Sequence, residues 1–218
     1  METIIKNEYF KEKDFRSKKF ESSSISLKGN NDILNLTQEK IIYDIHTKYL
    51  SAGADIIETN TFNSTKTSQF DYKCEDFSYD LNFSGGKIAR KAVDDFLIKN
   101  PNETKYVAGV LGPTNRTCSM SPDVNNPGFR NISFDELYSD YEKSSEALIE
   151  AGVDVIMVET VFDTLNAKAA LSSIGGACKK SKKNVPIMIS ATITDLSGRT
   201  LSGQTIEAFY NSILHVDP

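Results

Sequence analysis

One motif occurs twice in this chain of 218 residues: a short apolar run that follows Ala-Gly and ends in Glu-Thr. The first copy, 52–60, reads AGADIIETN, and the second, 151–160, reads AGVDVIMVET. A short continuous apolar run is typical of a strand that is covered on both faces. The glycine ends the preceding helix, because it adopts a positive φ at little steric cost. Each copy therefore predicts a helix, a tight turn, a buried strand and a glutamate, Glu58 or Glu159, at the carboxyl end of that strand.

Four apolar segments of this kind alternate with helical patterns along the chain. The strands are predicted at 54–60, 106–111, 153–160 and 186–193, and the helices at 37–53, 76–100, 133–152, 163–183 and 203–215. The capping residues expected at three helix starts are Thr37, Ser133 (a capping box with Glu136) and Asp163. No hairpin signal separates the strands, so we expect parallel βαβ units. The repeated motif favours an α/β fold that is part of a (β/α)8 TIM barrel, about strands 2 to 5 of its parallel sheet with flanking helices.

The composition narrows the class of protein. Hydrophobic residues make up 39% of the chain and the net charge is −5, which indicates a globular protein without a nucleic-acid footprint. No apolar run approaches the length of a membrane span, so we expect no membrane partner. The three cysteines are unclustered and favour free thiols in the cytoplasm. We interpret 1–218 as a single incomplete barrel domain in which 1–36 is an irregular N-terminal segment, a loop or short helices lying on a surface.

Polar side chains follow the predicted strands where α/β folds place their ligand sites. Glu58 and Glu159 end two strands, and Asn115 with Arg116 follows another. Each has a structural alternative, since such a glutamate equally caps a helix or pairs with an arginine, and Asn115 equally serves a turn. A lining of carboxylates and amides suits a small zwitterion or an amine. We interpret Cys118, in the long loop at 112–132, as an inert cysteine, because no histidine lies near it in sequence.

Several long stretches resemble the homocysteine-binding domain of cobalamin-dependent methionine synthase. They are GADIIETNTFNST at 53–65, VAGVLGPTNRT at 107–117, SPDV at 121–124, VETVFDTLNAK at 158–168 and DLSGRTLSGQT at 195–205. The resemblance implies a (β/α)8 barrel that transfers a methyl group from methylcobalamin, itself charged from methyltetrahydrofolate, to the sulfur of homocysteine, giving methionine. It also implies a zinc ion that three cysteines hold, and cobalamin and folate domains in a full-length homologue. The implied substrate-binding residues are Glu159 for the amino group, with Glu58, Thr59, Asn60, Asn115 and Arg116 lining the same mouth.

The chain departs from that family pattern at both ends. Only Met1-Glu2-Thr3 resembles the tail of the family's opening Asp-Gly-Gly-Met-Gly-Thr strand. The family's cysteine ligands would fall beyond Pro218, and Cys74, Cys118 and Cys178 match none of them. We therefore expect no zinc ligand, and no turnover by this chain alone. One alternative is a non-catalytic fragment or half-barrel that binds an amino acid weakly or pairs with another chain. Another is a different barrel enzyme that uses Glu58 and Glu159 as an acid/base pair.

Overall fold

A single parallel sheet of four strands organises the molecule. The structure is a computed structural model that describes residues 10–216, so Met1–Thr3 lies outside the described residues. The strands are β1 (Ile56–Glu58), β2 (Tyr106–Leu111), β3 (Val155–Val161) and β4 (Ile187–Ala191). They lie side by side in chain order and every neighbouring pair is parallel. This confirms the predicted α/β class and the partial barrel. β1 is shorter than expected, because it pairs with β2 over three residues only.

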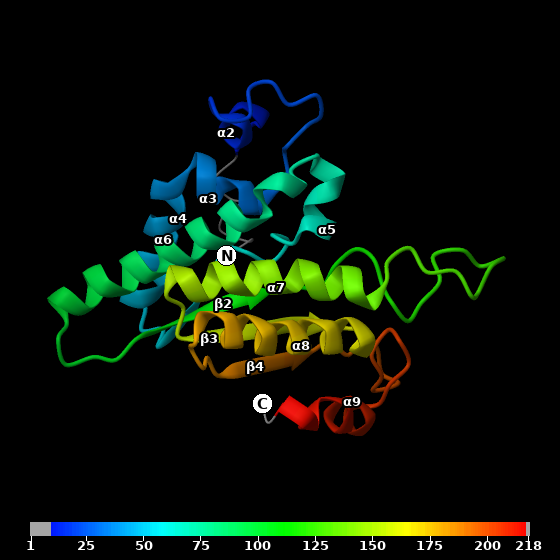
Figure 1. Ribbon diagram of the computed structural model, residues 1–218. Coiled ribbons are helices and arrows are strands. Elements are labelled where there is room, and N and C mark those ends of the chain that lie inside the picture. The colour runs from blue at the N-terminus through cyan, green and yellow to red at the C-terminus, as the bar shows by residue number, and fades with distance from the viewer. Residues whose placement is uncertain (1–9, 217–218) are drawn as a thin grey trace.

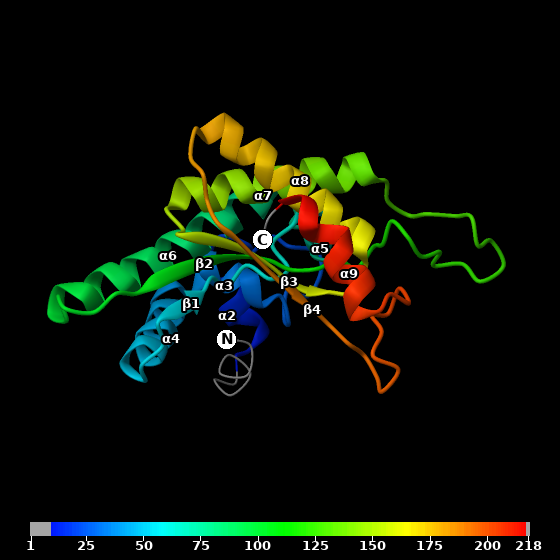
Figure 2. The same ribbon diagram turned by 90° about the horizontal axis from the view of Figure 1, so that it is seen from below.

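The long helices form a layer along one face of this sheet. They are α4 (Glu39–Ser51), α6 (Ser78–Lys99), α7 (Phe134–Ala151), α8 (Thr164–Ser181) and α9 (Ile206–Ile213). Each packs against the next in that order, and Figures 1 and 2 show α6, α7 and α8 covering the same side of the strands. The main core lies between the two layers and includes Val107, Ile156 and Leu148. The removal of these apolar side chains from water is the main force that holds the helices on the sheet.

The opposite face of the sheet carries exposed apolar side chains. Ile56 and Tyr106, which are paired in register, are 43% and 46% exposed, and Met188 is 40% exposed. In a closed barrel the inward-facing side chains of such strands fill the interior. These three side chains therefore mark the concave side of a sheet segment that curves as part of a barrel does. No helix within residues 10–216 has the length and apolar character to cross a bilayer.

Local signals in the sequence set most of the helix ends. Ser133 and Glu136 form the expected capping box at α7, and the Asp163 carboxylate caps α8 by accepting N–H groups of Leu165 and Asn166. Gly53 and Gly152 adopt positive φ angles of 100° and 94°, as expected of residues that end helices. The expected cap at Thr37 is wrong. Thr37 closes the short helix α3 (Leu34–Thr37), and Gln38 precedes α4.

The N-terminal segment is more ordered than its polar sequence predicts. It contains α2 (Glu12–Arg16), a 3-10 turn at Asn31–Ile33 and the start of α3. Phe15, Phe20 and Leu27 are buried in a second apolar cluster, which this segment shares with α4 and α6. The predicted short helices are confirmed in the described part of 1–36, whereas its position on a surface is wrong, because Phe15, Phe20 and Leu27 are buried in the second cluster. The cluster partners on α4 and α6 are far from this segment in sequence, so periodicity did not reveal the cluster.

The connections contain short elements as well. Residues of the loop after β1 form α5 (Lys66–Gln69) and the 3-10 turns Phe70–Tyr72 and Glu75–Phe77, and the described chain ends in the 3-10 turn Leu214–Val216. Two N–H groups at the start of α5, those of Lys66 and Thr67, are both accepted by Asp140 of α7 at 2.6 Å. This carboxylate therefore fixes the loop after β1 against the helix layer.

The Gly85-Gly86 pair in α6 has a packing role that the sequence did not indicate. By propensity alone, two glycines inside a helix weaken it by about 1 kcal/mol each. A Cβ at Gly85 would lie 2.6 Å from Thr61 Cγ2, and one at Gly86 would lie 2.6 Å from Ala151 Cβ. The glycines therefore let α6 approach the loop after β1 and the end of α7.

The capping box of α7 gives a first testable expectation. Ser133→Ala removes the hydroxyl that accepts the Glu136 N–H, so we expect the free energy of unfolding to fall by about 1 kcal/mol. Urea unfolding followed by circular dichroism measures this. Ser139→Ala, at a position inside the same helix, is the matched control and is expected to be neutral or slightly stabilising. Equal losses in both variants would contradict the capping role.

Candidate functional site

Glu58 at the end of β1 and Glu159, two residues before the end of β3, face one cavity. This cavity has a volume of about 460 Å3 and is lined by Glu58 and Glu159 together with Asp32, Thr59, Asn60 and Phe62. Both strands present their carboxyl ends here because they are parallel in one sheet. The sequence motif thus predicted two side chains, 101 residues apart, that the fold brings to the same cavity.

Carboxylates dominate the electrostatics of this cavity. Glu159 is half-buried, and burial raises the pKa of its carboxyl to about 7, with the negative charge of Glu58 acting in the same direction. In the described part of the chain, no lysine, arginine or histidine lines the cavity, and no group donates a hydrogen bond to Glu159. The structural alternatives for Glu159, a helix cap or an arginine pair, therefore do not describe it. A cation entering the cavity would relieve the repulsion between the two glutamates.

Thr59 and Asn60 also lie at this cavity, but their polar atoms bond within the protein. Thr59 Oγ1 accepts the Val110 N–H at 2.9 Å and lies 2.6 Å from Thr61 Oγ1. Asn60 Nδ2 donates to the Asn31 carbonyl at 2.9 Å, and both residues are buried. These contacts shape the cavity wall by fixing the loop after β1.

Asp32 is a cavity residue that the sequence did not single out. Its carboxylate accepts the Asn63 N–H at 2.9 Å and the Ser64 hydroxyl at 2.8 Å. The Asn30-Asn31-Asp32 stretch is typical of a turn, and its partners lie about thirty residues further along the chain. Only the packing of the N-terminal segment against the loop after β1 brings this third carboxylate to the cavity.

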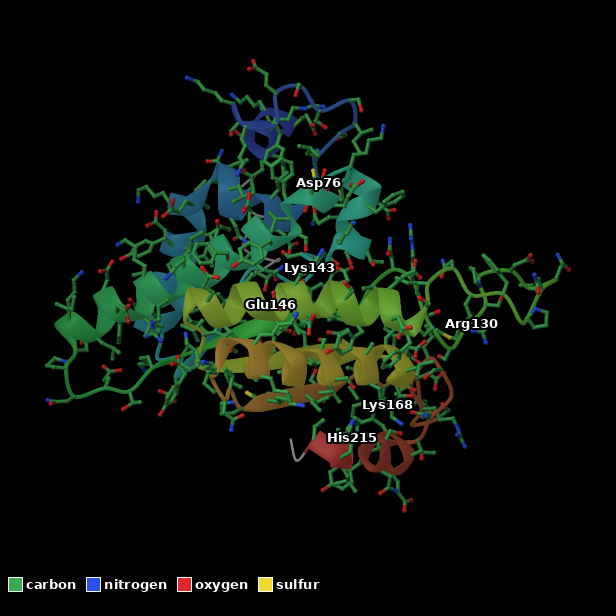
Figure 3. All side chains as sticks on the ribbon, viewed as in Figure 1. Asp76, Arg130, Lys143, Glu146, Lys168 and His215 are labelled. Atoms are coloured by element: carbon green, nitrogen blue, oxygen red, sulfur yellow. The ribbon has the colours of Figure 1, made fainter. Side chains whose placement is uncertain are left out.

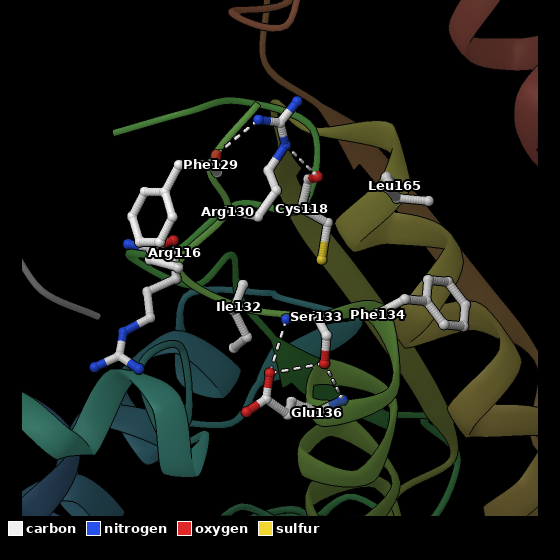
Figure 4. Close-up of a pocket in the computed structure, with 10 residues that line it drawn as sticks. Arg116, Cys118, Phe129, Arg130, Ile132, Ser133, Phe134, Glu136 and Leu165 are labelled. Carbon is white, nitrogen blue, oxygen red and sulfur yellow. Dashed lines mark hydrogen bonds between the residues drawn. The ribbon is translucent and has the colours of Figure 1, made fainter. Parts of the chain in front are cut away.

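The structure does not bring Asn115 and Arg116 to the same cavity. Asn115 Nδ2 donates to Asp71 at 2.7 Å, and the Arg116 guanidinium lies 5.0 Å from the centre of the Phe70 ring. Arg116 instead lines a wide, shallow depression of about 850 Å3 beside Ser133 and Cys118 (Figure 4). After Gly112 the chain leaves the carboxyl edge of the sheet. Asn115 and Arg116, which follow β2 by four and five positions, therefore lie away from the cavity.

The loop at 112–132 extends from the body of the fold. Figure 3 places Arg130 beyond the end of α7, the helix along which Lys143 and Glu146 lie. Arg130 anchors the base of the loop, since its Nε donates to the Cys118 carbonyl at 2.9 Å and its Nη1 to the Pro127 and Phe129 carbonyls. Burial, with the charge of Asp163, raises the pKa of the Cys118 thiol to about 11, so the thiol is protonated at neutral pH and a poor nucleophile.

Comparison with known proteins assigns the chain to a protein family. The model of the homocysteine S-methyltransferase family matches residues 1–218. The chain belongs to the homocysteine S-methyltransferase family. Its fold is similar to crystal structures of the homocysteine methyltransferase MmuM from Escherichia coli, at 20% sequence identity. The metallated form has a TM-score of 0.69 over 90% of this chain and 67% of that one, and the oxidized form 0.67 over 90% and 66%. The chain thus spans about two thirds of the length of those proteins.

The described residues do not fit the zinc site that this family implies. Cys74 is buried in the second apolar cluster, Cys118 lies in the long loop and Cys178 is on α8. Within residues 10–216, no three cysteine, histidine or acidic side chains are grouped so that they could hold a metal ion. Burial also raises the pKa of the Cys74 thiol, which opposes the thiolate form that zinc requires. The chemistry proposed below therefore takes no step through zinc.

Proposed function

We propose that this chain is the amino-acid-binding part of a homocysteine S-methyltransferase. In this proposal the Glu159 carboxylate, with Glu58 beside it, holds the ammonium group of homocysteine, and the sulfur accepts a methyl group to give methionine. The observation that carries the proposal is the cavity at the carboxyl ends of β1 and β3. It is lined by carboxylates and by no cationic side chain of the described chain.

The protonation of Glu159 supports recognition of an amine. With a pKa of about 7, the carboxyl is only partly ionised near neutral pH in the free protein. An ammonium group would stabilise the ionised form, and the half-buried position would strengthen the pair relative to one at the surface. Binding through the amino group would leave the thiol end of the substrate free for the transfer.

The methyl donor and the cofactors of the proposed reaction are assigned from the sequence resemblance. It implies methylcobalamin, charged from methyltetrahydrofolate on neighbouring domains; the zinc ion that it also implies has no ligand set among residues 10–216. The proposal includes substrate-binding roles for Thr59, Asn60, Asn115 and Arg116, and a cytoplasmic location. Thr59 and Asn60 are supported by their place at the cavity, whereas Asn115 and Arg116 lie elsewhere.

Calorimetric titration with homocysteine and with 4-mercaptobutanoate, which lacks only the amino group, tests the proposal. We expect the analogue to bind about 10-fold more weakly or worse, because a charged hydrogen bond contributes about 1.5–3 kcal/mol. Glu159→Gln is expected to remove most of this preference, and the exposed substitution Glu21→Gln is expected to keep it. Equal affinity for the two ligands in the wild-type chain would contradict recognition through the amine.

The exposed concave face favours a second candidate, a half-barrel that pairs with another chain. Ile56, Tyr106 and Met188 present apolar surface there, and among residues 10–216 no strand pairs with the outer side of β1 or of β4. A partner that supplies further strands would cover both features. Light scattering after size-exclusion chromatography distinguishes the candidates, since a monomer at micromolar concentration that binds homocysteine favours the first. A stable assembly without homocysteine binding favours the second.

A further inference from the structure

The carboxyl end of β3 contains a break in its pairing with β4. Val158 pairs with Ile189 and Val161 with Ala191, so β3 advances three residues while β4 advances two. The extra residue forms a β-bulge at Glu159-Thr160. Beyond it the regular pairing resumes, because the Thr192 N–H donates to the Val161 carbonyl at 2.9 Å.

The bulge changes the orientation of the residues that follow Glu159. Before it, Ile156 and Val158 point into the core, and Met157 between them points to the concave side. Strict alternation would then turn Thr160 into the core and Val161 out of it. Instead, Glu159 and Thr160 are both half-buried, and Val161 packs in the main core at 5% exposure. Alternation alone places Glu159 on the concave side, and the bulge keeps Thr160 out of the core and returns Val161 to it.

The backbone of Thr160, the second residue of the bulge, is strained. Its φ is +58°, in the left-handed region that is unfavourable for a β-branched residue. Such strain persists only where the surroundings enforce it. The Thr160 N–H donates to the Ser190 Oγ of β4 at 3.3 Å. Ser190 is the one side chain in the described chain that bonds to the bulge backbone at this residue.

We propose that the Thr160 bulge, tied to the Ser190 hydroxyl, is the device that positions the Glu159 carboxylate in the cavity, with Ser190 as a positioning residue. This deepens the proposed function, because it assigns the geometry on which amine recognition would depend. Other charged or titratable groups face Glu159 from neighbouring elements. They are Glu58 and Asp32 across the cavity, and Tyr141 and Asp163 beside a small space behind it. None of them bonds to the bulge, so a change at Ser190 alters the placement of Glu159 without removing a charge.

The first experiment compares Ser190→Ala with Ser190→Thr in the full chain. The readout is the titration midpoint of the Glu159 carboxyl, followed by carbon NMR of labelled glutamate and assigned with Glu159→Gln. We expect the alanine variant to lower the midpoint by at least one pH unit and to weaken homocysteine binding about 5-fold or more. The threonine variant keeps the hydroxyl and is expected to restore both values.

A second pair of variants tests the backbone conformation itself. Thr160→Gly retains the N–H and accepts a positive φ, so the midpoint is expected to stay within about 0.3 pH units of the wild type. Thr160→Pro removes the N–H and fixes φ near −65°, so the midpoint is expected to fall. If the proline variant does not fold, the serine pair decides the question.

Two results would overturn the proposal. One is a Ser190→Ala variant that loses stability but keeps the Glu159 midpoint, which is the behaviour of a merely structural hydrogen bond. The other is a Thr160→Gly variant whose Glu159 midpoint falls by more than about 0.3 pH units, although glycine can adopt the backbone conformation of the bulge. Because the midpoint requires no ligand, a wild-type chain that fails to bind homocysteine would contradict the proposed function alone.

Discussion

Glu159→Gln is expected to stabilise the folded chain by about 2–3 kcal/mol at alkaline pH and to leave it unchanged at acidic pH. Burial and the charge of Glu58 raise the folded-state pKa of Glu159 from 4.5 to about 7. Below pH 4.5 the carboxyl is protonated in both the folded and the unfolded chain, so it has no net effect. As pH rises through this window the unfolded chain ionises first, and the wild type loses stability until the folded-state pKa is passed. Glutamine avoids that loss.

Urea unfolding of the wild type and Glu159→Gln between about pH 4 and pH 9 measures the difference. Glu21→Gln, at an exposed position, is the matched control and is expected to show no such pH dependence. A constant difference across the range would show that Glu159 is not destabilised by its surroundings. The same substitution is expected to weaken homocysteine binding, so stability and recognition would change in opposite directions, as is common at functional sites.

Gly112→Ala is expected to destabilise the chain by about 3 kcal/mol or more, and to reduce homocysteine binding as well. A Cβ at Gly112 would overlap the carbonyl oxygen of Phe62 and lie 3.0 Å from its carbonyl carbon. Both groups are backbone, so neither can move by a change of rotamer. The Gly112 carbonyl also accepts the buried Tyr141 hydroxyl at 3.0 Å, which opposes a shift of this strand end. Phe62 lines the glutamate cavity, so any adjustment of its loop reaches the site.

Gly175→Ala provides the matched control for that substitution. Gly175 is an exposed residue within α8, and nothing lies within 4 Å of the position of its Cβ. Alanine there is expected to stabilise the helix by about 0.5–1 kcal/mol. Thermal unfolding of both variants gives the comparison. A Gly112→Ala chain that is as stable as the wild type would mean that the loop after β1 yields easily and does not hold the cavity in shape.

The sequence was sufficient for most local signals, with the expected cap at Thr37 as the exception. The Glu-Thr motif predicted two strands with Glu58 and Glu159 near their carboxyl ends, and the capping residues Ser133 and Asp163 predicted where α7 and α8 begin. The expected cover on both faces is wrong for β1, whose Ile56 is 43% exposed. These signals act over a few residues, because a cap or a turn glycine determines the hydrogen bonds and φ angles of its immediate neighbours. The parallel order of the strands followed from the alternation of helices and strands.

Features that depend on contacts between distant residues came only from the tertiary structure. It decided that Asp32 joins the cavity, that Arg116 stacks on Phe70 instead, and that Gly85 lies against Thr61. It also decided the left-handed bulge at Thr160, since a β-branched residue gives no local sign of a positive φ and the conformation is held by Ser190 on another strand. The sequence by itself thus determined the elements and the two glutamates. The fold alone determined which side chains surround them, because that depends on packing between segments that are distant in the chain.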